Sequence, residues 1–332
     1  MTAAGIDIGG ANLTGVREDG LVATRAFALW REPGGLATAL RELLAALEPF
    51  DRLAVTMTGE LCDCYSSKEE GVLHILAAVE EATAIAPQFW LLDEGLSDLE
   101  KARAEPLQAA AANWQALAAW AAGLEGNENS LLIDIGSTTT DIIRLEGGKP
   151  SAGGRTDTER LQLGELVYTG VRRTPVCALL EEADLGGQAC PLAAEHFATS
   201  LDAWLLLEEL AEDPGCLSTA DGRPATRSMA QDRLARMLCL DPQELSREEA
   251  LSLARQIALA QENKISRAIG RLIEKSRPAG AFISGEGEFL ALRALQSLGL
   301  DDSLITPMSR SCKAAGSEAA CAFALARLAA ES

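Results

Sequence analysis

Apolar and polar positions along the first part of the chain follow strand-like and helix-like patterns in turn. Short apolar runs bounded by glycine and polar residues predict two or three strands within residues 3–28. Apolar residues spaced three to four apart predict a helix over 36–47, and a second helix is expected over 69–83. Further strands are expected at 53–57 and 89–92. Strands interleaved with helices indicate an α/β fold.

The second half of the chain shows the same interleaving. A hairpin is expected from Ser130 to about Arg144, and a largely helical stretch over 191–277. Apolar residues between Ala250 and Leu272 mark one face of a long helix. The remaining expected elements are strands at 166–171, 176–180, 281–284 and 304–306 and helices at 290–298 and 314–330.

Residues 106–124 form an uncharged segment between the two halves. The segment is mostly alanine and includes Gln108, Asn113 and Gln115, so its hydropathy is low for a membrane span. We expect a buried helix that leads into the second half of the chain.

One motif occurs twice. Residues 4–12 read AGIDIGGAN, and residues 131–141 read LLIDIGSTTTD. Each copy has an apolar run, an aspartate, one apolar residue, a glycine and small polar residues, and another apolar run follows. This pattern predicts a buried strand, a tight turn and a returning strand, with Asp7 or Asp134 at the mouth of the turn.

The residue types in both turns suit a phosphate ligand. Glycine lets the backbone approach a ligand closely, and successive turn N–H groups can bind anionic oxygens. Asp7 and Asp134 could hold Mg²⁺ or Mn²⁺, which would bridge to the phosphates. One such turn could be a plain hairpin, but two copies favour a clamp for a polyphosphate. The candidate binding residues in the turns are Gly9, Gly10, Asn12, Gly136, Ser137, Thr138 and Thr139.

The two turns resemble the two phosphate loops of the actin, Hsp70 and sugar kinase superfamily. The strand, glycine turn and helix predicted over 281–289, with Gly285 in the turn, resemble its adenosine loop. The resemblance implies two duplicated RNase H-like α/β domains with a cleft between them. We expect these domains at 1–125 and 129–312, and a C-terminal helix within 313–332 that can return to the first domain.

Composition agrees with a two-domain globular protein. The chain has 332 residues, of which 48% are hydrophobic and 23% charged. Its formal net charge of −20 argues against nucleic acid or an anionic membrane as partner, because both require clustered basic residues. A small anionic substrate needs only a few local cations. The first predicted strand starts almost at Met1 with no basic leader, so we expect a cytoplasmic protein.

The eight cysteines include no C-x-x-C pair, and the chain has two histidines. In a cytosolic protein we expect the cysteines to be thiols. A structural zinc site or an iron–sulfur cluster is therefore not expected.

Several longer blocks resemble one family in particular, a hydantoinase/oxoprolinase-related group called the tetrahydromethanopterin-linked C1 transfer pathway protein. Its archaeal members are methanofuran biosynthesis enzymes that join an aminomethylfuran to glutamyltyramine. The resemblance covers nearly the whole chain. The blocks that carry it, besides 134–141, are residues 58–63, 111–114, 156–176, 219–222 and 232–237.

The resemblance implies a transferase in methanofuran-type cofactor biosynthesis for one-carbon metabolism. The phenol of γ-glutamyltyramine would displace diphosphate from (5-(aminomethyl)furan-3-yl)methyl diphosphate. Lys68 or Arg172 would complete the neutralisation of the diphosphate. Asp141 or Asp157 would serve as a base for the phenol, whose ordinary pKa is about 10. Asp141 could instead cap the threonine-rich turn, and Lys68 could be a solvated charge.

Two other classes of function stay open on the sequence. One is an ATP-dependent kinase or a lactam-opening hydrolase, although an oxoprolinase would have a larger second half and a partner subunit. The other is a non-catalytic nucleotide-binding pathway protein. An ATP site would need an adenine pocket near Gly285, so we expect Gly285→Val to harm an ATP site much more than a diphosphate site. The exact furan substrate and the oligomeric state are left open.

Overall fold

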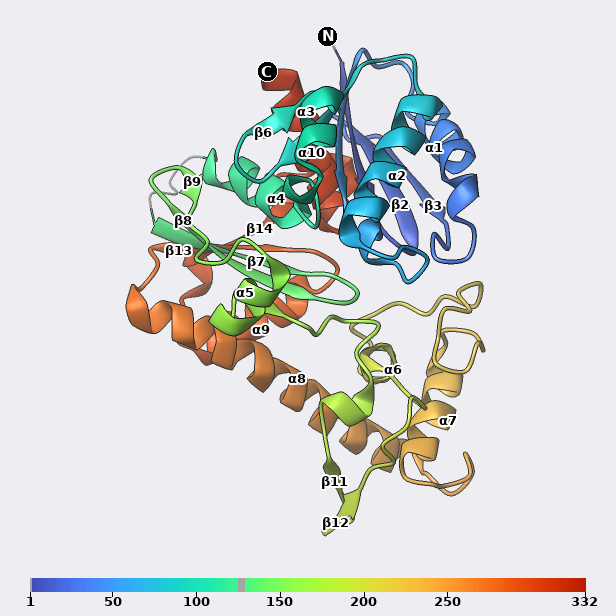
Figure 1. Ribbon diagram of the computed structural model, residues 1–332. Helices are drawn as coiled ribbons and strands as arrows, with labels where there is room; N and C mark the ends of the chain where they lie inside the picture. Colours follow the sequence, from blue (N-terminus) through green and yellow to red (C-terminus); the bar gives the residue numbers. More distant parts are fainter. Residues whose placement is uncertain (1, 125–128) are drawn as a thin grey trace.

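The computed structural model describes residues 2–124 and 129–332, which form two mixed β-sheets with helices packed on their faces (Figure 1). The strands of the first sheet are β1 (Ala3–Ile8), β2 (Asn12–Arg17), β3 (Val22–Ala26), β4 (Arg52–Met57), β5 (Pro87–Leu91) and β6 (Gly95–Ser97). Their order is β3-β2-β1-β4-β5-β6. The central strand β1 forms an antiparallel hairpin with β2 and lies parallel to β4 on its other side.

The second sheet repeats this arrangement. Its strands are β7 (Asn129–Ile135), β8 (Thr140–Glu146), β9 (Lys149–Pro150), β10 (Leu166–Val167), β13 (Gly280–Ser284) and β14 (Ile305–Pro307). Their order is β10-β8-β7-β13-β14, and β9 also pairs with β8. The central strand β7 is antiparallel to β8 and parallel to β13, as β1 is to β2 and β4. The predicted α/β fold with two RNase H-like units is confirmed.

Helices on the first sheet include α1 (Leu36–Ala45), α2 (Lys68–Ala82) and α3 (Leu99–Ala104). The side chains of α1 and α2 share one core with those of β1, β2 and β4. The C-terminal helix α10 (Ala320–Glu331) packs against β1, β2 and β4. A Cβ atom at Gly5 in β1 would lie 2.6 Å from the backbone nitrogen of Ala326, so this close packing requires glycine.

Two helices lie between the sheets, namely α10 and α4 (Asn113–Ala122) (Figure 1). Their side chains form one core with side chains from β2 of the first sheet and from β7, β8 and β13 of the second. Trp120 and Phe323 meet edge to face in this core, with ring centroids 5.3 Å apart. The C-terminal helix therefore helps to fix the two sheets relative to each other.

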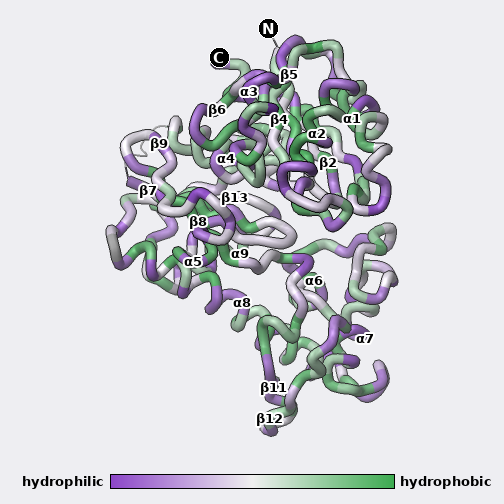
Figure 2. The backbone as a smooth tube through the Cα atoms, viewed as in Figure 1, coloured by the Kyte–Doolittle hydropathy of each residue, from purple (hydrophilic) through white to green (hydrophobic). Residues whose placement is uncertain are grey.

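The second sheet carries α5 (Asp157–Leu163), α8 (Arg247–Lys275) and α9 (Glu288–Ser297). The long helix α8 extends past the sheet to a lobe built from α6 (Ser200–Leu206), α7 (Arg227–Met237) and the hairpin of β11 (Glu182–Leu185) and β12 (Gln188–Pro191) (Figure 1). In Figure 2 hydrophobic positions gather where helices and strands pack on one another, in this lobe as in the sheets. Within the described residues, no helix is both long enough and apolar enough to cross a membrane.

Most of the predicted elements are present, with shifted ends, but two predictions are wrong. The buried helix expected within 106–124 is present as α4, which starts at Asn113 after a 3-10 turn at Pro106–Gln108 and Ala111 with φ of 47°. The strand expected at 166–171 stops at Val167, because the following residues wrap around the second aspartate turn. The strand expected at 176–180 is a 3-10 turn, Val176–Ala178.

Candidate active site between the two aspartate turns

The first aspartate turn links β1 to β2. The Gly9 N–H donates to the Asn12 carbonyl at 3.0 Å and closes the turn. The carbonyls of Gly10 and Ala11 accept hydrogen bonds from the segment that follows β3. The N–H groups of Gly10 and Ala11, in contrast, make no hydrogen bond to a described residue, so they are available to an anionic ligand. A Cβ atom at Gly10 would lie 2.7 Å from the Cys62 Sγ.

The second aspartate turn, between β7 and β8, is built in the same way. The Gly136 N–H donates to the Thr139 carbonyl at 3.0 Å. The carbonyls of Gly136 and Ser137 accept from the backbone N–H groups of residues 171–173, at 2.9 to 3.0 Å. Among the described residues, no acceptor is recorded for the N–H groups of Ser137 and Thr138. Both turns therefore combine occupied carbonyls with available N–H groups.

The two aspartates at the turns lie close enough to influence each other electrostatically. Burial raises the pKa of Asp7 to about 7, and its Oδ1 atom has no hydrogen-bond partner among the described residues. Burial also raises the pKa of Asp134 to about 7, with smaller contributions from the carboxylates of Asp141, Asp7 and Glu288. The space around Asp134 is thus rich in carboxylates. Such a space would repel a diphosphate unless a cation accompanied it.

The donor set suits a hard divalent cation. Mg²⁺ commonly takes one or two protein carboxylates and completes its shell with water and phosphate oxygens. In the described part of the chain, no group of three or more His, Cys, Asp or Glu residues is placed to hold a metal by itself. Asp7, with its unpartnered buried oxygen, and Asp134 therefore fit a metal that arrives with the substrate, and the metal remains a prediction.

Asp141 lies opposite Asp134 in the β7–β8 hairpin and is buried. Its Oδ1 atom accepts a hydrogen bond from Arg160 Nη2 at 2.7 Å, and Arg160 is only 1% exposed. The Arg160 guanidinium stacks over the Trp114 ring at 4.0 Å. Burial raises the pKa of Asp141 although Arg160 opposes the rise. The ion pair occupies an oxygen that the predicted base would use, so holding Arg160 is the role that this geometry supports.

The predicted cation Arg172 already has a partner. Its Nε atom lies 2.8 Å and 2.6 Å from the two carboxylate oxygens of Glu286. The neighbouring Arg173 is exposed, and its side chain forms no ion pair with a described residue. Its charge acts on the Cys62 thiol beside the first turn, opposing the rise in pKa that burial causes there. The Arg173 backbone bonds to the second turn and its charge acts near the first, so Arg173 is a further candidate for the cation that the sequence prediction assigned to Lys68 or Arg172.

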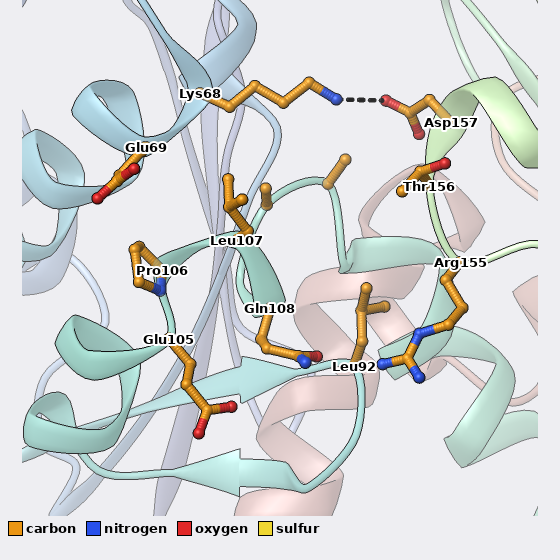
Figure 3. Close-up of a pocket in the computed structure, with 12 residues that line it drawn as sticks. Lys68, Glu69, Leu92, Glu105, Pro106, Leu107, Gln108, Arg155, Thr156 and Asp157 are labelled. Atoms are coloured by element: carbon orange, nitrogen blue, oxygen red, sulfur yellow. Dashed lines mark ion pairs between the residues drawn. The ribbon is translucent and has the colours of Figure 1, made fainter.

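Lys68 lies away from the turns, in a cavity of about 500 Å³ at the start of α2 (Figure 3). Its Nζ atom is 3.8 Å from Asp157 Oδ2, and Asp157 is the first residue of α5. The pair bridges the first and second halves of the molecule. We call this space the interdomain cavity. Its lining residues are Lys68, Glu69, Leu92, Glu105, Pro106, Leu107, Gln108, Ala110, Ala111, Arg155, Thr156 and Asp157.

Glu60, in the sequence block 58–63, is a functional candidate that the sequence alone does not single out. Glu60 is 1% exposed, and neither of its carboxylate oxygens has a hydrogen-bond partner among the described residues. Burial raises its pKa to about 7; Asp157 adds to the rise, and Lys68 and nearby backbone N–H groups oppose it. One feature of the sequence could have pointed to Glu60: it is an acidic residue just after β4, the parallel neighbour of β1. Ligands bind at the carboxyl ends of parallel strands, so an acidic residue there is a candidate for the site.

The glycine turn at 285–287 supports the second aspartate turn directly. Gly285 has φ of +86°, and a Cβ atom there would lie 2.8 Å from Asp134 Oδ1. A cavity of about 570 Å³ lies beside this turn, and Glu286, Glu288 and Glu318 contribute to its lining. We therefore now expect Gly285→Val to harm a diphosphate site as well as an ATP site, because the added side chain would push on Asp134 itself.

A buried polar network connects the second turn to the helical lobe. Gly170 packs so closely on the turn that a Cβ atom there would lie 2.5 Å from the Gly136 carbonyl oxygen. The Gly170 carbonyl accepts from Ser200 Oγ and from Gln261 Nε2, each at 2.8 Å. Gln261, in α8, also accepts from the Trp204 indole at 2.8 Å. The lobe therefore helps to hold the second turn in shape.

Known proteins resemble the chain over most of its length. A family model described as hydantoinase/oxoprolinase matches residues 51–332. A (4-{4-[2-(γ-L-glutamylamino)ethyl]phenoxymethyl}furan-2-yl)methanamine synthase from Methanocaldococcus jannaschii is 31% identical over 315 residues, covering 91% of this chain and 94% of that protein. A synthase of the same name from Methanococcus vannielii is 33% identical over 172 residues, or 52% of this chain and 77% of that protein.

Solved structures show the same fold at low identity. A ROK family glucokinase from Streptomyces griseus, in complex with glucose and AMPPNP, superposes with a TM-score of 0.51 at 12% identity over the full length of both chains. A nucleotide-free acetone carboxylase gives a TM-score of 0.56 at 12% identity, over 98% of this chain and 70% of that one. The chain belongs to the hydantoinase/oxoprolinase family, in the group that includes the archaeal furanylmethanamine synthases.

Proposed function

We propose that this protein is an enzyme that joins an (aminomethyl)furanmethyl diphosphate to the phenol of γ-glutamyltyramine and releases diphosphate. The name of the Methanocaldococcus jannaschii relative describes an ether between such a phenol and a furanylmethyl carbon. The observation that supports the proposal is the pair of turns, each with available N–H groups beside an aspartate, whose two aspartates lie within electrostatic range of each other. Together they suit a ligand with two linked phosphates and one metal ion.

The reaction would exchange one carbon–oxygen bond for another. The bond from the furanylmethyl carbon to the diphosphate breaks, and the diphosphate leaves with the electron pair. The phenol oxygen forms the new bond to that carbon, and the phenolic proton passes to a base. The furan ring stabilises positive charge on the carbon during the exchange, so the main requirement on the protein is to stabilise the leaving group.

The chain offers several groups for that task. N–H groups of Gly10, Ala11, Ser137 and Thr138 would donate to diphosphate oxygens as negative charge develops on them. Arg173 would add a positive charge, since it has no ion-pair partner among the described residues. Asp7 and Asp134 would hold Mg²⁺, which when bound supplies charge neutralisation of the leaving diphosphate.

The test is a product assay with three substrate sets. The purified protein is incubated with Mg²⁺ and the furanylmethyl diphosphate, with or without γ-glutamyltyramine, and separately with Mg²⁺, ATP and γ-glutamyltyramine. We expect diphosphate release and ether formation only when both proposed substrates are present. Turnover of ATP without any ether product would reject the proposal in favour of a kinase or an ATP-coupled hydrolase.

A binding competition separates the same alternatives without turnover. Inorganic diphosphate should bind the Mg²⁺-loaded protein and compete with the furanylmethyl diphosphate, because both would occupy the two turns. ATP should compete weakly, because the space beside Gly285 is lined by three glutamates. ATP binding tighter than that of diphosphate would contradict this expectation.

A further inference from the structure

Glu60 is a buried carboxylate with no hydrogen-bonding side chain on either oxygen among the described residues. Asp7 at the first turn shares this property at its Oδ1 atom, whereas Asp202 in the helical lobe is paired with Arg233 at 2.7 Å. An unpaired buried carboxylate costs several kcal/mol of stability when it is ionised. A fold retains such a group most readily where a ligand completes it.

The position of Glu60 connects the interdomain cavity to the first aspartate turn. The preceding residue, Gly59, packs on that turn: a Cβ atom there would lie 3.2 Å from the Ile8 carbonyl oxygen and 3.4 Å from the Gly9 carbonyl carbon. On its other side Glu60 is within electrostatic range of Lys68 and Asp157, which line the cavity (Figure 3). Glu60 is not itself a lining residue, but the backbone N–H of the lining residue Ala111 acts on its carboxylate, so Glu60 lies between the first turn and the wall of the cavity.

The cavity itself suits an amphiphilic molecule with a charged end. Its volume of about 500 Å³ is in the range of small-molecule sites. Leu92, Pro106 and Leu107 give it apolar surface, and in Figure 3 they lie between the Lys68–Asp157 pair and the side chains of Glu105 and Arg155. The lining thus offers charges of both signs around an apolar centre, which matches an aromatic ring that carries an amino-acid end.

We propose that the interdomain cavity binds the phenolic acceptor and that Glu60 is the base that takes its proton. The inference rests on the proposed function and deepens it by assigning the second substrate and the proton acceptor. In the step, the phenol O–H bond breaks and its proton moves to a Glu60 oxygen. The phenol oxygen attacks the furanylmethyl carbon, and diphosphate leaves with the electron pair of the broken bond.

Two charged side chains act on Glu60: Lys68 of α2 favours its carboxylate form, and Asp157 of α5 disfavours it. The Cys62 thiol, two residues further along the chain, is a neighbouring titratable group whose pKa burial raises. With a pKa of about 7, Glu60 is ionised above neutral pH and protonated below it. The rate of ether formation should therefore rise with pH through about 7, because only the carboxylate can accept the phenolic proton.

The experiment is Glu60→Gln in the full-length protein, assayed by ether formation. At saturating Mg²⁺, which holds Asp7 and Asp134 ionised, we expect kcat to fall about 100-fold and the rise of rate with pH near 7 to disappear, while binding of Mg²⁺-diphosphate is unchanged. A ring-fluorinated acceptor, whose phenol is already ionised at pH 8, needs no base. With that acceptor the defect of Glu60→Gln should shrink to less than tenfold, which a purely structural role of Glu60 would not produce. Glu80→Gln, an exposed site on α2, is the matched control and should keep wild-type rates.

A second variant tests the cavity without touching Glu60. Ala110→Phe should fill part of the cavity and raise the KM for the acceptor at least tenfold, with the KM for the furanylmethyl diphosphate unchanged. If Glu60→Gln keeps its rate within threefold, or loses as much with the fluorinated acceptor as with the natural one, the inference is overturned while the proposed function stands. If the wild-type protein forms no ether, the proposed function fails and the inference fails with it.

Discussion

Replacing Asp134 by asparagine should stabilise the metal-free protein while removing its activity. Burial and neighbouring carboxylates raise the pKa of Asp134 from 3.8 to about 7, so the fold favours the protonated form. The stability that this preference provides is complete below pH 4 and is lost as pH rises through 7. Asparagine is neutral at every pH, and it therefore avoids the loss.

The size of the effect follows from the pKa shift. A rise from 3.8 to about 7 corresponds to about 4 kcal/mol if Asp134 titrates alone. Asp134 keeps some solvent contact and titrates together with Asp7 and Asp141, so we expect about half of this, ~2 kcal/mol, in favour of Asp134→Asn at pH 8. The difference should grow between pH 4 and 7 and shrink toward zero below pH 4.

Urea unfolding at several pH values, without metal, measures the free energy of unfolding of both proteins. Added Mg²⁺ and diphosphate should then stabilise the wild type but not the variant, because ligand binding to the folded state adds to its stability. The rate of ether formation should fall at least 100-fold, which corresponds to about 2.7 kcal/mol of transition-state stabilisation.

Asp141→Ala is the matched comparison and should have the opposite sign. It removes both the charge and the hydrogen-bond acceptor that face Arg160, which is 1% exposed, and should cost about 3–5 kcal/mol of stability because a buried cation is left unpaired. An Asp134→Asn protein that is less stable than wild type at pH 8, or a difference that does not change with pH, would refute the reasoning about Asp134.

Four further predictions follow from the same geometry. Arg173→Ala should weaken binding of Mg²⁺-diphosphate, measured by calorimetry, about tenfold, which corresponds to about 1.4 kcal/mol. Arg236→Ala on the helical lobe is the control and should bind like the wild type, and equal affinities of the two variants would exclude Arg173 from the site. Gly5→Ala should lower the free energy of unfolding by about 1–3 kcal/mol, because the added methyl group meets the backbone of α10, while Gly34→Ala, which has open space, should be nearly neutral. Gly285→Ala should weaken diphosphate binding together with any ATP binding, and a loss confined to ATP would show that this turn acts separately from Asp134. Excess chelator should abolish ether formation and added Mg²⁺ or Mn²⁺ should restore it; full activity in chelator would reject the metal role.

The local pattern of the sequence was sufficient for the strand, turn and strand around each aspartate. Apolar runs on both sides of Asp7 and Asp134 have to be buried, and glycine and small polar residues between them allow a tight turn. Because both turns arise from one repeated pattern, the sequence also implied two similar sheets, and the strand orders agree with that.

The sequence did not determine which charged side chains are available at the site. Strand alternation was expected to continue to residue 171, but the strand stops at Val167 and the chain wraps around the second turn, which leaves Arg173 rather than Arg172 as the free cation. Glu60 looked like an ordinary loop residue along the chain, and only the tertiary structure buries its carboxylate without a side-chain partner.

The difference has a physical cause. A hydrophobic period or a glycine turn depends on neighbours within a few residues, so it can be recognised along the chain. Whether a charge is paired depends on segments far apart in sequence, such as Arg172 with Glu286, 114 positions away, or Lys68 with Asp157. Arg172 and Glu286 meet because residues 171–173 and the turn at 285–287 both pack on the second aspartate turn. Lys68 and Asp157 meet only once α4 and α10 have fixed the two sheets against each other. Both pairings are properties of the tertiary structure alone.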